Sequence, residues 1–189
     1  MAFRVAILAN FDPDEPGGSE MLSRITTLLC CSRTGATEIT VHAAIRGDAF
    51  PDPSEYDLVV LTGGPFNLLK HAEENERPEW VQRTLGWIQE IDIQKNHGLV
   101  VTHPGPYLTS IASGSSSSQN EVLLSHSPPI LTFQGHPEMD AALARLFAGF
   151  ATGGASDRAD WIPSEGLKGI DDVYDGEAIL KRVVAWADE

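Results

Sequence analysis

The sequence has little that would bind nucleic acid, cross a membrane or direct secretion. Its 13 Lys and Arg residues face 27 Asp and Glu residues, for a formal net charge of -14, so no basic face exists for a phosphate backbone. No apolar run approaches the ~20 residues that a membrane-spanning helix needs. The opening MAFRVAILANF is typical of a strand rather than a signal peptide. These features predict a cytoplasmic protein with no nucleic-acid or membrane partner.

Cysteine is equally scarce. The only two, Cys30 and Cys31, are adjacent inside a helical pattern. They form no disulfide framework, which suits a reducing compartment, and we expect them to be buried as small apolar side chains. The six histidines show no metal-ligand spacing, so we predict no metal site, and no cofactor is indicated. The partners expected are small molecules or proteins.

The apolar pattern predicts one α/β domain over residues 1–189. Residues 3–9 form a continuous apolar run, as in a strand buried on both faces, 57–62 form another short buried run, and residues 38–45 alternate. Helical patterns follow Ser19, a candidate N-cap, and Pro78. This alternation of strands and helices favours a mostly parallel sheet.

In the second half of the sequence the apolar runs are shorter. Short apolar runs at 99–102, 121–124 and 130–133 predict strands, and the serine-rich 113–120 between them predicts a solvated turn. Helices are predicted from Glu138 to Phe150 and near 177–187.

Two short motifs could carry chemistry. In TFQGHPEMD (132–140), His136 and Glu138 stand two residues apart, and an imidazole oriented by a carboxylate is a general acid–base. After the strand at 57–62, Gly63 and Gly64 could present free N–H groups to an anion or oxyanion. The plainer alternatives are a hydrogen-bonded pair that only packs, and a tight turn.

Further candidates are weaker. His103 follows a predicted strand, and Tyr107 could offer a hydroxyl nearby. Strand ends are where open α/β sheets bind ligands, so both could line a substrate site, although a surface loop is the usual setting for such a histidine. The acidic loop FDPDEP fits solvent better than a cation.

Together, DLVVLTGGPFN, TFQGHPEMD and the strand FRVAIL resemble the class I glutamine amidotransferase family, over most of the chain. The resemblance implies a three-layer, flavodoxin-like α/β fold. It also implies that Gly63 and Gly64 match the oxyanion turn, and that His136 and Glu138 match the base and its orienting carboxylate in a Cys-His-Glu triad.

The nucleophile of that triad has no counterpart. Members of the family carry Gly-x-Cys-x-Gly between the two motifs, and no Cys follows residue 31 here. Only 72 positions (136 minus 64) separate Gly64 from His136, which leaves little room for the elbow strand and its helix. Gly86, unfavourable inside a helix, marks the expected seam. We therefore expect a flavodoxin-like domain shortened in the middle.

Without a thiolate, glutamine hydrolysis through a thioester has no first step. One interpretation is a repurposed enzyme that uses His136 and Glu138 for acid–base chemistry on a small carbonyl compound, such as cyclisation, isomerisation, decarboxylation or elimination. The second is a catalytically inactive binding or regulatory protein, and the third is a shortened isoform. The interrupted sheet also predicts a homodimer that covers the open edge.

Overall fold

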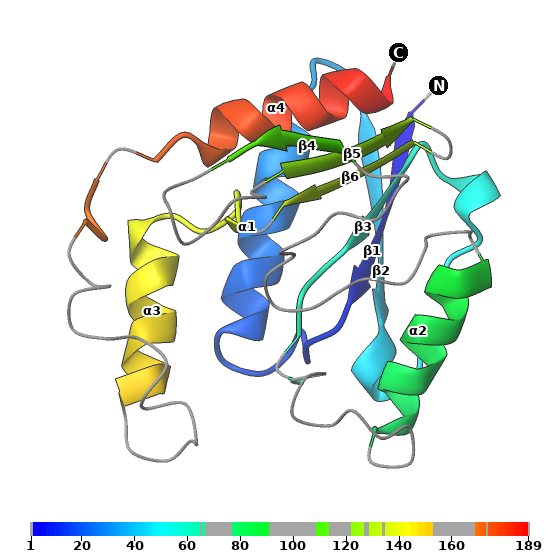
Figure 1. The fold of residues 1–189 in the computed structure, drawn as a ribbon, viewed down its shortest axis with the longest axis horizontal. Coiled ribbons are helices and arrows are strands. Elements are labelled where there is room, and N and C mark those ends of the chain that lie inside the picture. The colour runs from blue at the N-terminus through cyan, green and yellow to red at the C-terminus, as the bar shows by residue number, and fades with distance from the viewer. Residues whose placement is uncertain are drawn as a thin grey trace.

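The computed structural model describes residues 2–64, 66, 77–90, 109–113, 122–126, 129–133, 135–152, 169–172 and 174–188. A parallel sheet stands between helices on both of its faces (Figure 1). None of the helices in these ranges is long and apolar enough to cross a membrane.

The parallel sheet contains β1 (Phe3–Ala9), β2 (Thr37–Ala43) and β3 (Leu58–Leu61), in the order β2-β1-β3. Val5 of β1 pairs with Ile39 of β2 and with Leu58 of β3. The central strand β1 is buried along its length except at Arg4. This is the continuous apolar strand predicted at 3–9, confirmed at both ends.

Alternate residues of β1 serve two cores because successive side chains point to opposite faces. On one face, Val5 and Ile7 pack with α1 (Gly18–Cys31) and α4 (Gly176–Ala187). On the other face, Leu8 packs with Trp87 and Ile88 of α2 (Glu79–Glu90). The sheet and its two helical layers are the three layers expected.

A second, antiparallel sheet contains β4 (Thr109–Ala112), β5 (Val122–His126) and β6 (Pro129–Phe133), in that order. It lies beneath α4 in Figure 1. The strands predicted at 121–124 and 130–133 are confirmed as β5 and β6, whereas the predicted strand at 99–102 and residues 114–120 of the serine-rich turn lie outside the described residues. β6 leads directly to the segment that carries His136. Short 3₁₀ turns at Ala44–Arg46 and Pro53–Glu55 complete the elements before α2.

Three local predictions are wrong. The N-cap of α1 is Gly17 rather than Ser19, because Gly17 takes a left-handed φ of 86° and its N–H donates to the Glu20 carboxylate at 2.6 Å. The third helix, α3 (Ala141–Thr152), begins three residues later than Glu138. Its start is set by Asp140, whose carboxylate accepts the Leu143 N–H at 2.9 Å.

The third error concerns the thiols, because Cys30 and Cys31 are exposed. The buried stripe of α1 runs through Ile25, Leu28 and Leu29, and the two cysteines lie off this stripe on the helical wheel. The helix therefore turns both thiols toward solvent.

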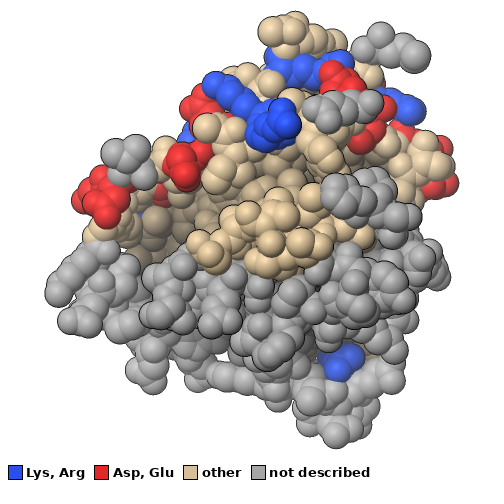
Figure 2. Space-filling model, turned by 45° about the horizontal axis from the view of Figure 1, so that its top comes forward, with Lys and Arg blue, Asp and Glu red and all other residues tan. Residues whose placement is uncertain are grey.

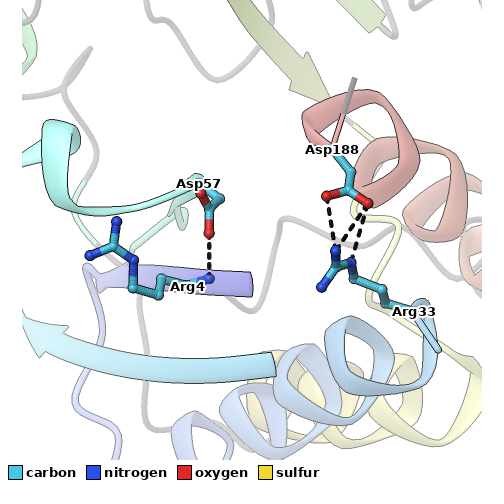
Figure 3. A network of polar contacts seen from close by, with 4 residues as sticks. All are labelled: Arg4, Arg33, Asp57 and Asp188. Carbon is cyan, nitrogen blue, oxygen red and sulfur yellow. Dashed lines mark hydrogen bonds and ion pairs between the residues drawn. The ribbon is translucent and has the colours of Figure 1, made fainter. Parts of the chain in front are cut away.

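Polar contacts join segments far apart in the sequence (Figure 3). Arg33, just after α1, binds both carboxylate oxygens of Asp188, just after α4, at 3.0–3.3 Å. The Arg4 N–H donates to Asp57 at 2.7 Å, which ties the start of β1 to the start of β3. On the face shown in Figure 2, the described acidic and basic side chains are interspersed rather than segregated.

Candidate functional site

The Gly63–Gly64 turn follows β3 at the carboxyl end of the parallel sheet. The Thr62 N–H still donates to Leu8 at 3.1 Å, so the ladder with β1 extends one residue beyond the strand. Both glycines are exposed. Among the described residues their N–H groups have no hydrogen-bond acceptor.

His136 lies beside this turn. A Cβ built on Gly63 would stand 3.9 Å from Cε1 of the imidazole, which is ordinary van der Waals contact. The His136 side chain is 52% exposed and can therefore be reached from solvent. The fold thus brings together the two motifs that the sequence separates by more than seventy positions.

The backbone of His136 is strained. Its φ of 47° lies in the left-handed region, where no other described residue except glycine is found. The Met139 N–H closes the turn by donating to the His136 carbonyl at 2.9 Å. Such conformations persist where the surroundings enforce them, and they are common at functional sites.

Glu138 orients the imidazole. Nδ1 of His136 donates to Oε1 of Glu138 at 2.8 Å, and the Glu138 side chain is only 15% exposed. This hydrogen bond to the carboxylate raises the pKa of His136 above its ordinary value, while burial acts in the opposite direction. With Nδ1 engaged, Nε2 is the ring nitrogen left to exchange a proton with a ligand.

Behind Glu138 lies a group of three side chains from three segments. Arg24 of α1 forms an ion pair with Asp140 at 3.3 Å, and its guanidinium lies 5.8 Å from the centre of the Tyr174 ring. Burial raises the pKa of Tyr174, and Arg24 lowers it. The Glu138 and Asp140 carboxylates raise this pKa further. The Tyr174 hydroxyl is buried and has no hydrogen-bond partner among the described residues.

The start of α4 packs directly on the turn between His136 and Glu138. A Cβ on Gly176 would occupy the space of the Pro137 carbonyl oxygen and of the Tyr174 hydroxyl. Only glycine permits this approach, so the C-terminal helix fixes the turn from behind.

The acidic loop after β1 is solvent-exposed at Asp14 and Glu15, and its aspartates pair with an arginine. Arg46 forms ion pairs with Asp12 and with Asp14, the latter at 2.5 Å. Hydrogen bonding to Arg46 lowers the pKa of Asp12. No group of three or more potential metal ligands occurs in the part of the chain that the structure describes.

His103 and Tyr107 lie outside the described residues. An open depression of about 250 Å³, between Arg4, Glu38, Thr40, Glu55 and Tyr56, is remote from the glycine turn because it lies where β1 begins.

Sequence reasoning missed the residues that hold the two motifs in place, namely Asn10, Tyr174 and Gly176. Each acts through contacts that only the tertiary fold creates. Their positions show no period or motif.

The chain is similar to a curated protein and to solved structures. The chain is 38% identical to a curated protein of Gibberella zeae named "Glutamine amidotransferase-like protein chry6", over 245 aligned positions that cover 98% of this chain and 95% of the relative. Since this chain has 189 residues, at least 56 of those positions (245 minus 189) have no residue of this chain. No protein-family model matches.

The second match is a crystal structure of a glutamine amidotransferase from Thermotoga maritima. It superposes with a TM-score of 0.58 at 15% identity, covering 100% of this chain and 97% of the other. At that identity the match shows the fold alone, and it confirms the flavodoxin-like α/β class.

Proposed function

Because the chain belongs to the glutamine amidotransferase-like family, we propose that it is a repurposed member without glutaminase activity. It moves protons on a small carbonyl compound through His136 and Glu138, without a covalent intermediate. The observation that carries the proposal is that the His136 imidazole lies beside the Gly63 turn while its Nδ1 is hydrogen-bonded to Glu138.

The chemistry follows from these positions. Nε2 of His136 removes a proton from the carbon next to a carbonyl, and the electron pair moves onto the carbonyl oxygen as an enolate. The N–H groups of Gly63 and Gly64 stabilise the negative oxygen. Glu138 stabilises the imidazolium, which returns the proton to the product or to a leaving group.

The absence of a cysteine after residue 31 supports the loss of glutaminase activity. At least 56 positions of the relative without a residue in this chain also support a missing segment. We therefore expect no ammonia from glutamine in a coupled glutamate dehydrogenase assay. Turnover near ~1 per second, within the usual enzyme range, would show that another group serves as the nucleophile.

Proton transfer itself can be tested without knowing the natural substrate. A panel of small ketones, keto acids and amides is incubated with the protein in D₂O, and NMR follows loss of the proton next to each carbonyl. We expect exchange on at least one compound, reduced ~10²–10⁴-fold in His136→Ala. His42→Ala is the matched control, because His42 instead contacts Ala49 and Tyr56.

Exchange that persists at full rate in His136→Ala would contradict the assigned base. Exchange with no compound of the panel would favour the second candidate, a binding or regulatory protein. That candidate is favoured by the edge of β3, which pairs only with β1 among the described residues and carries Leu61 at 38% exposure. We propose that a second copy of this chain covers that edge.

A further inference from the structure

We propose that Asn10 is a positioning residue, which sets the Gly63–Gly64 turn in line with His136. Asn10 follows the last residue of β1 and is only 8% exposed. It has no access to a ligand of its own. Its side chain instead links the end of β1 to the end of β3, one residue before the turn.

Asn10 makes two directed hydrogen bonds with Thr62, one from its side-chain amide and one from its backbone N–H. Its Nδ2 donates to the Thr62 carbonyl at 2.8 Å, and the Asn10 backbone N–H donates to the Thr62 hydroxyl at 3.0 Å. Because the Thr62 carbonyl can only accept, it also determines which end of the amide faces it. The last peptide before Gly63 is therefore held from both sides.

Gly64 rests on the same residue. A Cβ on Gly64 would stand 3.0 Å from the Asn10 Cβ and 3.3 Å from its carbonyl carbon, and closer still to its carbonyl oxygen. The turn thus lies on the backbone of Asn10 and is tied to its side chain. Since a Cβ on Gly63 would stand 3.9 Å from Cε1 of His136, the turn lies beside the imidazole, and Asn10 defines how the two donors and the base face one another.

The opposite end of the amide is held more weakly. The Thr84 hydroxyl lies 3.3 Å from Oδ1 of Asn10, but its single proton has a nearer acceptor, the Trp80 carbonyl at 2.8 Å. The position of the turn therefore depends on the Thr62 side of Asn10. This contrast supplies a matched control in the same buried region.

The test uses ¹⁵N relaxation of the full chain, which needs no substrate. In Asn10→Ala we expect order parameters at Gly63 and Gly64 to fall from ~0.85 to below ~0.6, while Val5 and Ile7 of β1 stay near ~0.85. The Cε1–H resonance of His136 should shift, because its neighbour has moved.

Asn10→Asp is the sharper variant, since it keeps the shape of the amide but sets a carboxylate oxygen against the Thr62 carbonyl. It should loosen the turn at least as much as Asn10→Ala. If Asn10→Asp does not fold, Asn10→Ala alone decides, because it introduces no buried charge. Thr84→Val should leave both glycines ordered.

Unchanged order parameters at Gly63 and Gly64 in a folded Asn10→Ala would overturn the proposal. So would equal loosening in Thr84→Val, or loss of order throughout β1, because the turn would then be responding to general loosening of the core. The consequence of this positioning for catalysis rests on the proposed function, whereas the positioning of the turn by Asn10 does not. If relaxation changes as expected but no panel compound exchanges, the proposed function fails and Asn10 keeps its role.

Discussion

The two adjacent glycines of the turn should respond in opposite ways to the same substitution. Neither glycine has a φ in the left-handed region, so the backbone at both positions accepts an alanine without strain. At Gly64 a Cβ would stand 3.0 Å from the Asn10 Cβ, well inside the ~3.5–4.0 Å of a normal carbon–carbon contact, and would also meet the Asn10 backbone. At Gly63 the nearest atom is Cε1 of His136 at 3.9 Å.

Overpacking of this kind costs about 1–3 kcal/mol, so Gly64→Ala should lower the free energy of unfolding by that amount. For a chain of this size each kcal/mol shifts Tm by about 2–4 °C. Gly63→Ala meets no clash and restricts the unfolded chain, so it should be neutral or stabilising by up to about 1 kcal/mol.

Urea denaturation followed by circular dichroism measures both free energies, and a thermal scan gives the two Tm values. The pair serves as its own control because the residues are neighbours with the same chemistry. Equal stability of the two variants would refute the close approach of Gly64 to Asn10, and with it the basis for a rigid turn.

Three further predictions concern charge, thiols and assembly. Glu138 raises the pKa of His136, so NMR should place its titration above the ordinary ~6.5 and Glu138→Gln should lower it. Because the folded pKa is the higher one, this stabilisation is complete below ~6.5 and lost as pH rises through the folded value. The difference in the free energy of unfolding between the unmodified protein and Glu138→Gln should therefore shrink between pH 6 and pH 9. A constant difference would contradict the assignment. Cys30 and Cys31 should react with Ellman's reagent in the native protein, and a need for denaturant would restore the buried interpretation. Light scattering at micromolar concentration should give a dimer mass, and a monomer mass would exclude the covered β3 edge.

Helices and strands whose apolar pattern follows directly from the faces they bury were predictable from the sequence. The run at 3–9 is apolar because β1 is central in its sheet, and the pattern after Pro78 is amphipathic because α2 covers one face. The boundary errors arose where a single side chain or φ angle decides. Asp140 caps α3 and Gly17 caps α1, and both choices depend on contacts that periodicity does not encode.

Part of the candidate site could also be predicted from the sequence, and part could not. His136 and Glu138 are close in sequence, so their hydrogen bond could be anticipated from spacing alone. The contact between His136 and Gly63 was expected only through family resemblance, since it spans the whole middle of the chain. The roles of Asn10 and Gly176 could not be anticipated, because each depends on how closely two backbones approach.

The contact of Gly176 with Pro137 also has a consequence for biosynthesis. The helix that backs the His136 turn, α4, follows β1, β2, β3 and α1 in the chain, and Arg33 and Asp188, 155 residues apart, join its end to α1. While α4 is still in the ribosomal exit tunnel, β1, β2, β3 and α1 can associate, but the turn has nothing to rest on. We therefore expect the turn at Pro137 to become ordered only after α4 has left the tunnel and packed against it.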